Sequence, residues 1–335
     1  MRALKWIMVL ALALAVFTAC GRNQTDDELT TVRVSEVTRS VFYAPQYAAI
    51  ELGFFEDEGI SIDLITSDGA DRVMTALLSG AADIGLSGPE AAIYVWAGGR
   101  ADHAIVFAQL TQRDGSFLIA REPMPNCTWD DIRGSHVLPG RRGGMPFMVL
   151  EYVMREQGIL PDIDVDFDTS VQFGVMVSAF LGGTADFVTA FEPVASTIEL
   201  EGRGYVVASI GEASGEIPYT AYYALESFMN ENPDIIMGFT RAIARGQQWV
   251  YENPPALIAE VIAPFFPDAD PVILASAIAR YKEIEAYAKL PMVSEEAFAR
   301  LQRVMDSAGE LPAYAPFERL VDNTFAEYSA ASLMN

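Results

Sequence analysis

Two carboxylates lie beside the prolines of two similar segments, and they are the first candidates for ligand contact. Glu90 directly follows Pro89, and Glu192 directly precedes Pro193. A carboxylate that faces a ligand accepts hydrogen bonds from its donor groups and repels an anion. Either carboxylate could instead pair with an arginine. If they face a ligand, they favour one that donates hydrogen bonds or carries positive charge.

Two glycine-containing loops could bring backbone amides close to a polar ligand atom. Ser87-Gly88 precedes one predicted helix, and Gly143-Gly144 stands between Arg142 and Met145. Helix N-termini present unpaired N–H groups, and glycine admits a close approach. The second loop lacks the Lys-Ser/Thr of a nucleotide P-loop, which argues against nucleotide hydrolysis. Each loop could instead have a purely structural role. The first could be a turn before a proline, and the second could be a solvated surface turn.

Aromatic side chains are frequent in the loops that carry these residues. A planar ligand stacks on such rings, and an aromatic pair contributes about 0.5–1.5 kcal/mol beyond the burial of its area. Each ring could instead belong to the hydrophobic core. The aromatic candidates are Phe42, Tyr43, Phe147, Phe173, Phe191 and Tyr219.

The complete candidate ligand site adds charged and small residues of neighbouring loops, and Arg113 is a further charged candidate. It consists of Arg39, Phe42, Tyr43, Asp68, Gly69, Ser87, Gly88, Glu90, Arg142, Gly143, Gly144, Met145, Phe173, Phe191, Glu192 and Tyr219. The two histidines, His103 and His136, have no singled-out partners for a metal, and no Ser-His-Asp spacing stands out. We therefore expect no metal, cofactor or catalytic residue. The net charge of −24 argues against a nucleic-acid partner.

A motif that occurs twice supplies the elements that position these residues. Ser67–Pro89 reads SDGADRVMTALLSGAADIGLSGP, and Ser170–Pro193 reads SVQFGVMVSAFLGGTADFVTAFEP. In each copy, apolar residues at helical spacing end at Gly80 or Gly183, and a short apolar strand and a proline follow. Each copy therefore predicts a helix, a strand and the start of another helix. A repeat offset by about 100 residues is too long for a solenoid and indicates two similar α/β lobes.

The same pattern predicts where a ligand would bind. Open α/β sheets bind ligands at the carboxyl ends of their strands, in loops that lead into helices. Two lobes of this kind would form a cleft lined by such loops. They are Thr38–Tyr43, Asp68–Asp71, Ser87–Glu90, Arg141–Met145, Thr169–Phe173 and Ala190–Pro193.

Residues 1–19 are predicted to be an export signal. A short basic region precedes Trp6–Phe17, which is apolar but too short to span a bilayer. The segment ends FTACG, which resembles the cleavage box of bacterial lipoproteins and implies that Cys20 is lipidated. An ordinary secretory signal with an incidental cysteine is the alternative. Residues 20–30 would form the lipidated tether, and Cys127 alone would remain, so no intrachain disulfide is expected.

Length and composition indicate two domains. A chain of 335 residues is long for one core, and a composition of 51% hydrophobic residues can fill two. The chain would leave the first lobe, build the second and return, with crossing strands near Ser116–Ala120 and Thr220–Leu225. We predict lobe I from residues 31–118 plus 223–335, and lobe II from residues 119–222.

The C-terminal third is predicted to be a helical scaffold. Asn232-Pro233 opens a helix that runs to about Asn253, and Asp270-Pro271 opens another that runs to about Lys289. Ser294 opens a third helix, which ends at Gly309.

Several motifs in the same order resemble a known family. The strand Thr31–Val37, the Tyr-Ala-Pro loop and ELGFFEDEGISIDL resemble the periplasmic binding proteins for taurine, alkanesulfonates, nitrate and the thiamine-precursor pyrimidine. The resemblance continues through GADRVMTALLSGAADIGLSGPEAA, QLTQRDGSFLI, RRGGMP and TAFEPVAS, over about residues 31–260. It implies a two-lobed α/β fold of the type II-like periplasmic-binding-protein class that closes on a solute. Tyr43 and Phe191 match cleft positions of the family.

The resemblance implies a lipid-anchored, monomeric solute-binding protein on the outer face of the cell membrane. Its partners would be a small-molecule ligand and an ABC permease with its ATPase. The carboxylates favour a thiamine-precursor pyrimidine or a similar heterocycle. A sulfonate, taurine or nitrate binder that uses Arg39, Arg142 and helix N-termini is an alternative, and a ligand-sensing lipoprotein is another. A related fungal branch is enzymatic and cysteine-rich, whereas this chain has one cysteine besides Cys20, so we do not expect an enzyme.

Overall fold

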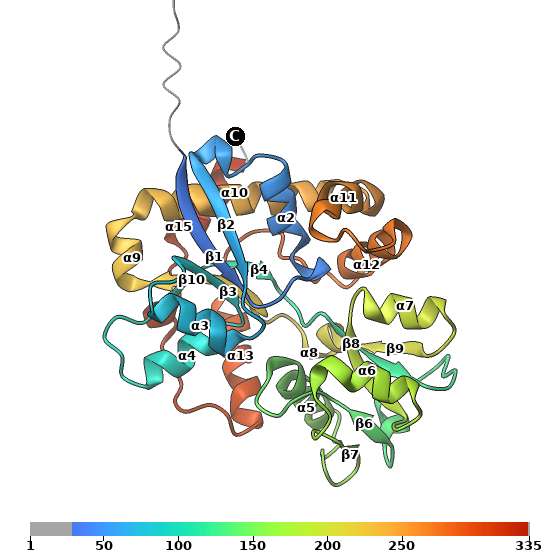
Figure 1. Cartoon of the computed structure of the whole chain (residues 1–335). Helices are drawn as coiled ribbons and strands as arrows, with labels where there is room; N and C mark the ends of the chain where they lie inside the picture. The colour runs from blue at the N-terminus through green and yellow to red at the C-terminus, as the bar shows by residue number, and fades with distance from the viewer. Residues whose placement is uncertain (1–28, 334–335) are drawn as a thin grey trace, which may run out of the picture.

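Two five-stranded mixed sheets, each flanked by helices, form two lobes in the computed structural model, which describes residues 29–333 (Figure 1). This confirms the two-lobed α/β fold expected from the repeat. The predicted export signal and Cys20 lie outside the described residues. Thr30, which we placed in the tether, already belongs to the first strand.

The first sheet has the strand order β2-β1-β3-β10-β4. Strands β2, β1 and β3 are parallel, and β10 runs antiparallel to both of its neighbours. The strands are β1 (Thr30–Glu36), β2 (Ile60–Thr66), β3 (Ile84–Ser87), β4 (Ala104–Thr111) and β10 (Thr220–Leu225).

The second sheet repeats this arrangement, with the order β7-β6-β8-β5-β9. Strands β7, β6 and β8 are parallel, and β5 runs antiparallel to β8 and β9. The strands are β5 (Ser116–Ala120), β6 (His136–Leu138), β7 (Asp166–Phe167), β8 (Phe187–Phe191) and β9 (Tyr205–Ser209). In each sheet, the antiparallel strand is the first one that the chain forms after crossing from the other lobe.

The helices cover both sheets and fill the C-terminal third (Figure 1). They are α2 (Ala44–Glu51), α3 (Ala70–Leu78), α4 (Glu90–Ala97), α5 (Met145–Glu156), α6 (Phe173–Leu181), α7 (Val194–Leu200), α8 (Ile210–Ser214), α9 (Glu226–Glu231), α10 (Pro233–Glu252), α11 (Pro255–Ile262), α12 (Pro271–Glu283), α13 (Glu295–Ser307), α14 (Phe317–Leu320) and α15 (Thr324–Leu333). Short 3-10 turns are η1 (Val41–Tyr43), η2 (Glu56–Glu58), η3 (Trp129–Ile132) and η4 (Ala263–Phe265).

The repeated motif forms the predicted unit in both lobes. The first copy contains α3, β3 and the start of α4, and the second contains α6, β8 and the start of α7. Gly80 and Gly183 follow the first helix of each copy with φ angles of 73° and 95°, in the region that favours glycine. The buried residues of α3, Val73, Met74 and Leu77, follow the helical spacing seen in the sequence.

The predicted lobe boundaries at 118/119 and 222/223 each cut through a strand. All of β5 pairs within the second sheet, and all of β10 pairs within the first. The chain therefore crosses in the connections 112–115 and 210–219, and not along the strands themselves. We propose that these connections divide the lobes.

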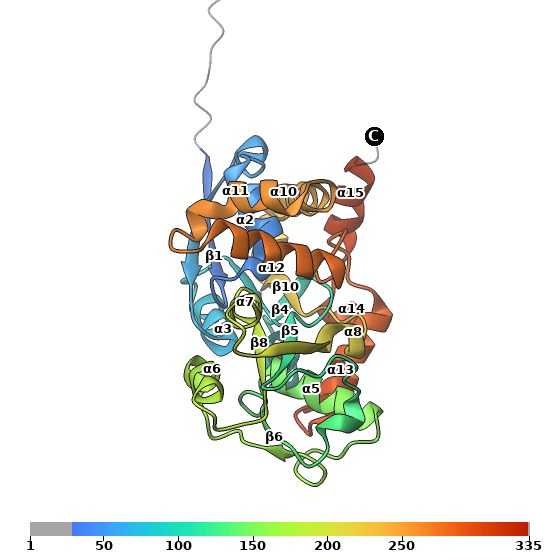
Figure 2. The same cartoon turned by 90° about the vertical axis from the view of Figure 1, so that its right-hand side faces the viewer.

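The C-terminal helices begin where proline and cap residues predicted, but α12 is shorter than expected. It ends at Glu283 and not near Lys289, because Glu285 adopts a φ of 52° and the following residues become extended. Tyr287 then bridges to Thr111 beside β4. Helix α12 packs on η1 of the first lobe and on α7 of the second (Figure 2).

Candidate functional site

Aromatic rings from both lobes meet where the two sheets face each other. Phe42 of η1 lies 6.2 Å from Phe191 at the end of β8, measured between ring centroids. Tyr219, in the connection that returns to the first lobe, lies 5.6 Å from Phe42 and 6.4 Å from Phe191. Tyr281 of α12 completes the group at 5.0 Å from Phe42. We call Phe42, Tyr43, Phe191, Tyr219 and Tyr281 the aromatic cluster.

Hydrogen bonds fix η1, the turn that carries Phe42 and Tyr43. The Ser40 hydroxyl accepts from the Phe42 N–H at 3.2 Å, which caps the turn. The Tyr287 hydroxyl donates to the Val41 carbonyl at 2.9 Å. Both rings are buried, so they contribute to the core as well as to the interface between the lobes. Ring contacts of this kind are also what a planar ligand would use.

Glu90 brings a buried carboxyl to the edge of this cluster. It is the first residue of α4, three residues after the end of β3, and is 8% exposed. Its Oε2 atom has no hydrogen-bond partner within residues 29–333. Gly88 makes the placement possible, since a Cβ atom there would lie 1.9 Å from Glu90 Oε2. Ser87 turns away and shares a 2.6 Å hydrogen bond with the Tyr223 hydroxyl.

Burial dominates the electrostatics around Glu90. Loss of water raises its pKa to about 7, with a small opposing effect from its own backbone N–H. Burial also raises the pKa of the Tyr43 and Tyr219 hydroxyls. The charge of Glu36 raises the pKa of Tyr43 further, the charge of Asp114 raises that of Tyr219 further, and the charge of Glu90 adds to both. A hydrogen-bond donor brought to Oε2 would satisfy a group that is now unpaired.

Asp114 is a second buried carboxyl at this place, and the sequence candidates did not include it. It lies in the 112–115 crossing and is 0% exposed. Its Oδ1 accepts from the Ser116 backbone N–H at 2.6 Å and from the Ser116 hydroxyl at 2.5 Å. Its Oδ2 has no hydrogen-bond partner in the described part of the chain. The available signal was its position between two apolar strands, inside the quoted motif QLTQRDGSFLI.

Glu192 is buried and fully engaged by other groups. Its Oε1 accepts from Arg280 at 2.8 Å, and its Oε2 accepts from the Ser196 N–H at 2.9 Å. Its own N–H donates to the Tyr281 hydroxyl at 3.0 Å. Arg280 also pairs with Glu199 at 2.5 Å. The alternative of an arginine partner therefore holds for Glu192, which ties the second lobe to α12, while Glu90 is left as the carboxylate candidate for a ligand.

The arginines proposed for an anionic ligand are paired elsewhere. Arg39 pairs with the buried Glu36 at 2.8 Å and lies over the rings of Tyr47 and Phe265. Glu36 in turn accepts from Gln46, Tyr47 and Thr66. These contacts pair the charge of Arg39 with its own carboxylate.

Two further arginines have carboxylate partners of their own. Arg142 is half exposed and pairs with Asp162 at 2.5 Å, so its predicted role at the ligand is not supported by its contacts. Arg113 faces Glu285 at 3.4 Å, although its Nε atom has no partner within residues 29–333. The positive charge of each is therefore matched by a carboxylate.

The remaining candidates lie on neighbouring loops of the two lobes. Gly143 approaches Glu310 of the first lobe, since a Cβ atom there would lie 3.3 Å from Glu310 Oε1. Gly144 caps α5, and Met145 begins it and is buried. Asp68 is exposed, with a φ of 54°, and Gly69 caps α3. Phe173 begins α6, and its side chain lies outside what the structure describes.

Unpaired buried oxygens from several elements give the site its chemical character. Among the described residues, those at or near the aromatic cluster are Glu90 Oε2, Asp114 Oδ2, Thr189 Oγ1 and the Tyr219 hydroxyl. Thr189 is two residues before Phe191 on β8, so both side chains lie on the same face of the strand. Residues 29–333 hold no group of three or more His, Cys, Asp or Glu that could bind a metal. Such a set suits a neutral or cationic ligand with hydrogen-bond donors.

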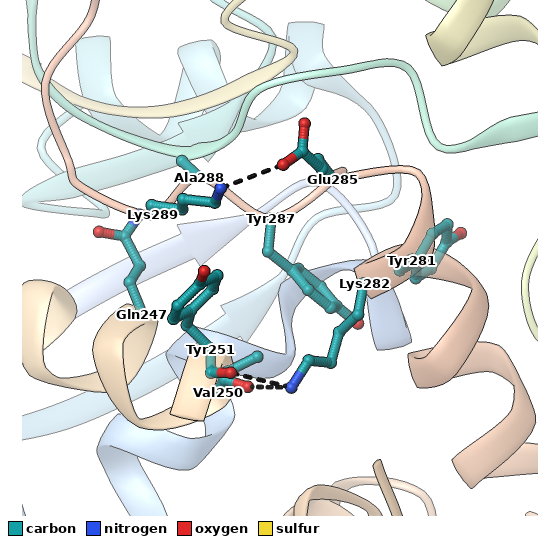
Figure 3. A pocket seen from close by; sticks show the side chains of 9 residues that line it. All are labelled: Gln247, Val250, Tyr251, Tyr281, Lys282, Glu285, Tyr287, Ala288 and Lys289. Atoms are coloured by element: carbon teal, nitrogen blue, oxygen red, sulfur yellow. Dashed lines mark hydrogen bonds and ion pairs between the residues drawn. The ribbon is translucent and has the colours of Figure 1, made fainter. Parts of the chain in front are cut away.

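A small pocket of about 110 Å³ lies behind the aromatic cluster, between α10 and the end of α12 (Figure 3). Tyr281 and Tyr287 line the pocket, and the ammonium groups of its two lysines already have partners. Lys282 donates to the Val250 carbonyl at 2.8 Å, and Lys289 pairs with Glu285 at 3.0 Å. The described residues of the pocket therefore offer no free cation to a ligand.

Residues 41–256 match the family described as NMT1/THI5 like. The chain belongs to this family. It is 44% identical over 309 residues to the Bacillus subtilis (strain 168) protein named "Putative binding protein YtlA", and the alignment covers 92% of each chain. This relative is named as a binding protein and not as an enzyme, in line with the expectation from the sequence.

Solved structures share the fold at low sequence identity. The alkanesulfonate-binding protein SsuA from Xanthomonas axonopodis pv. citri superposes with a TM-score of 0.70 at 16% identity, over 89% of this chain and 99% of that chain. The nitrate-binding protein NrtA from Synechocystis PCC 6803 gives 0.69 at 16% identity, over 91% and 89%. At these identities, the superpositions show that the fold is shared. Within residues 29–333, no helix is both long and apolar enough to cross a membrane.

Proposed function

We propose that this chain is the solute-binding protein of an ABC importer and that its solute is a planar nitrogen heterocycle with N–H donors, of the aminopyrimidine kind. Glu90 carries the proposal. Its buried Oε2 has no hydrogen-bond partner within residues 29–333, and it lies beside aromatic rings that come from both lobes. The solute would be enclosed when the lobes close on this cluster.

The electrostatics favour a donor-bearing ligand over an anion. A buried acceptor left without a partner costs about 1–3 kcal/mol, which an amino group of the ligand would recover. A sulfonate or nitrate would instead need unpaired cations beside the cluster. Arg39 is held by Glu36, and Arg280 is held by Glu192 and Glu199. Stacking on Phe42 or Phe191 would orient a flat ring.

The test is isothermal titration of the mature protein with 4-aminopyrimidine, comparing the wild type with Glu90→Gln. The glutamine keeps the size of the side chain but removes the charge and one acceptor. We expect binding to weaken by about 10-fold to 100-fold, the loss of one hydrogen bond to a charged group.

Glu226→Gln is the matched control, because Glu226 is also the first residue of its helix but is exposed. Like Glu90→Gln, this substitution removes a carboxylate charge from the N-terminus of a helix, but it leaves the aromatic cluster unchanged. Equal affinity in all three proteins would contradict the role of Glu90. Binding of taurine or nitrate in place of 4-aminopyrimidine would overturn the proposed ligand class.

We further propose export and anchoring through a lipid on Cys20, as the FTACG segment indicates. Cys20→Ser should move the protein from the membrane fraction to the soluble fraction, as detected by immunoblot. Retention in the membrane fraction would mean that another feature anchors it.

A transport protein and a sensor differ in the partner that they contact. If the protein serves an importer, the ligand-loaded protein should stimulate the ATPase of a reconstituted permease.

A further inference from the structure

We propose that Asp114 is a second ligand-contacting residue and sets a preference for solutes with two hydrogen-bond donor groups, one for Glu90 and one for Asp114. This inference rests on the proposed function, since it concerns the same site. It starts from the unpaired Oδ2 atom of a side chain that is 0% exposed.

The position of Asp114 is fixed from both sides. Ser116 holds its Oδ1 through the backbone N–H and the hydroxyl, so the carboxyl cannot rotate without losing two hydrogen bonds. Gly211 of the other crossing abuts its backbone, since a Cβ atom there would lie 2.1 Å from the Asp114 carbonyl oxygen. Oδ2 is therefore held in place and lacks a hydrogen-bond partner among the described residues.

Tyr219 connects Asp114 to the aromatic cluster. Burial raises the pKa of the Tyr219 hydroxyl most, and the charges of Asp114 and Glu90 raise it further. The ring of Tyr219 contacts Phe42 and Phe191. A side-chain hydrogen bond with Tyr219 offsets part of the effect of burial on the pKa of Asp114. By distance and angle, however, neither Asp114 Oδ2 nor the Tyr219 hydroxyl has a hydrogen-bond partner among the described residues, and a ligand donor would supply one to Oδ2.

Asp114 lies in a connection between the lobes, and this position affects which solutes the site would prefer. Asp114 belongs to the connection 112–115, Tyr219 belongs to the connection 210–219, and Glu90 belongs to the first lobe. A solute that donates to Glu90 and to Asp114 would bridge one lobe and the hinge. A solute with one donor would leave one buried acceptor unpaired.

The experiment measures the wild type and Asp114→Asn by isothermal titration with 4-aminopyrimidine and with the three isomers 2,4-, 4,5- and 4,6-diaminopyrimidine. The isomers present the second amino group at each ring position, so the geometry need not be assumed. In the wild type, at least one diamino isomer should bind about 10-fold more tightly than 4-aminopyrimidine. Asparagine can still accept from Ser116 but donates where Oδ2 accepted, so this gain should vanish while the affinity for 4-aminopyrimidine changes less than about 3-fold.

Asp168→Asn is the matched control, because Asp168 accepts from the N–H and hydroxyl of Ser170 just as Asp114 does from Ser116. It should leave the preference intact. Two results would overturn the inference while the proposed function stands: no diamino isomer exceeds 4-aminopyrimidine, or Asp114→Asn keeps the preference. If no pyrimidine binds and taurine does, both the inference and the proposed function fail.

Discussion

At the scale of residues, two enclosed carboxyls dominate the site. Burial raises the pKa of Glu90 and of Asp114 to about 7 in each case, far above the ordinary values of such groups. Both therefore change protonation near neutral pH, where exposed carboxyls are fully ionised. Each can accept a hydrogen bond from a ligand when ionised, and each is tolerated as a neutral group when no ligand is bound.

We predict that the stability of the unliganded protein falls as pH rises from about 4.5 to about 7. In this window, the unfolded chain has lost the protons of Glu90 and Asp114 while the folded chain still holds them, so raising the pH favours unfolding. Above about pH 7, the loss from these groups is complete. Urea unfolding of the wild type and Glu90→Gln between pH 5 and pH 8 checks this, and the variant should lose roughly 3 kcal/mol less than the wild type.

The exposed Glu226→Gln variant supplies the comparison, since it should keep the full fall of the wild type. Glu36 contributes in the same direction, because burial raises its pKa as well, so Glu90→Gln should flatten the dependence only in part. A Glu90→Gln protein whose stability falls as steeply as that of Glu226→Gln would contradict the burial of an ionisable group at Glu90.

The sequence located Glu90 but could not distinguish its role from that of Glu192. Both carboxylates adjoin a proline at matching places in the repeat. Their difference comes from Arg280, which lies 88 residues beyond Glu192 on a helix that the repeat does not contain. Asp114 escaped notice for a related reason. Its importance depends on Tyr219 and Gly211, which come near it only when the chain returns from the second lobe.

At the scale of elements, α12 joins the two lobes beside the aromatic cluster. Arg280 binds Glu192 and Glu199 of the second lobe, and it lies over the ring of Phe117 at 5.5 Å. Tyr281 accepts a hydrogen bond from the Glu192 N–H. The helix itself packs against η1 of the first lobe. These contacts must break when the lobes separate.

We predict that Arg280→Met lowers the free energy of unfolding by about 3 kcal/mol. Removing one partner of a buried ion pair leaves Glu192 with an uncompensated charge in a side chain that is 0% exposed. Urea denaturation measures the change. Small-angle X-ray scattering of the same protein should show a larger radius of gyration, because the lobes lose a contact that holds them together.

Arg203→Met is the control for this effect. Arg203 pairs with Glu201 at 3.4 Å, but both side chains are about half exposed, so the loss should stay below about 1 kcal/mol. If the two arginine variants have the same stability and the same radius of gyration, α12 does not hold the lobes together through Arg280.

The local signals in the sequence were sufficient for most elements. Caps and prolines predicted the starts of α10, α12 and α13, and the repeated motif predicted α3, β3, α6 and β8. The end of α12 could not be predicted in this way. Residues after Glu283 leave the helix to pair beside β4, a partner more than 170 residues earlier in the chain. Helix α11 was not predicted, and it begins at Pro255, just beyond the predicted end of the preceding helix.

At the scale of the whole molecule, two sheets with the same strand pattern face each other across one aromatic cluster. Each sheet receives its antiparallel strand from the crossing chain, so β5 and β10 fix the lobes to the two connections between them. Movement at these connections would separate Phe42 from Phe191 and expose Glu90 and Asp114 together. Under the proposed function, capture of a solute and closure of the lobes would therefore be one event.

The most direct test is native mass spectrometry of the mature protein as purified, followed by denaturation to identify the small molecule that is released. The wild type should release a nitrogen heterocycle with at least one amino donor, and Glu90→Gln purified in parallel should carry less of it. A copurified sulfonate, nitrate or other small anion, retained equally by both proteins, would contradict the assignment of Glu90 and move the site to the arginines.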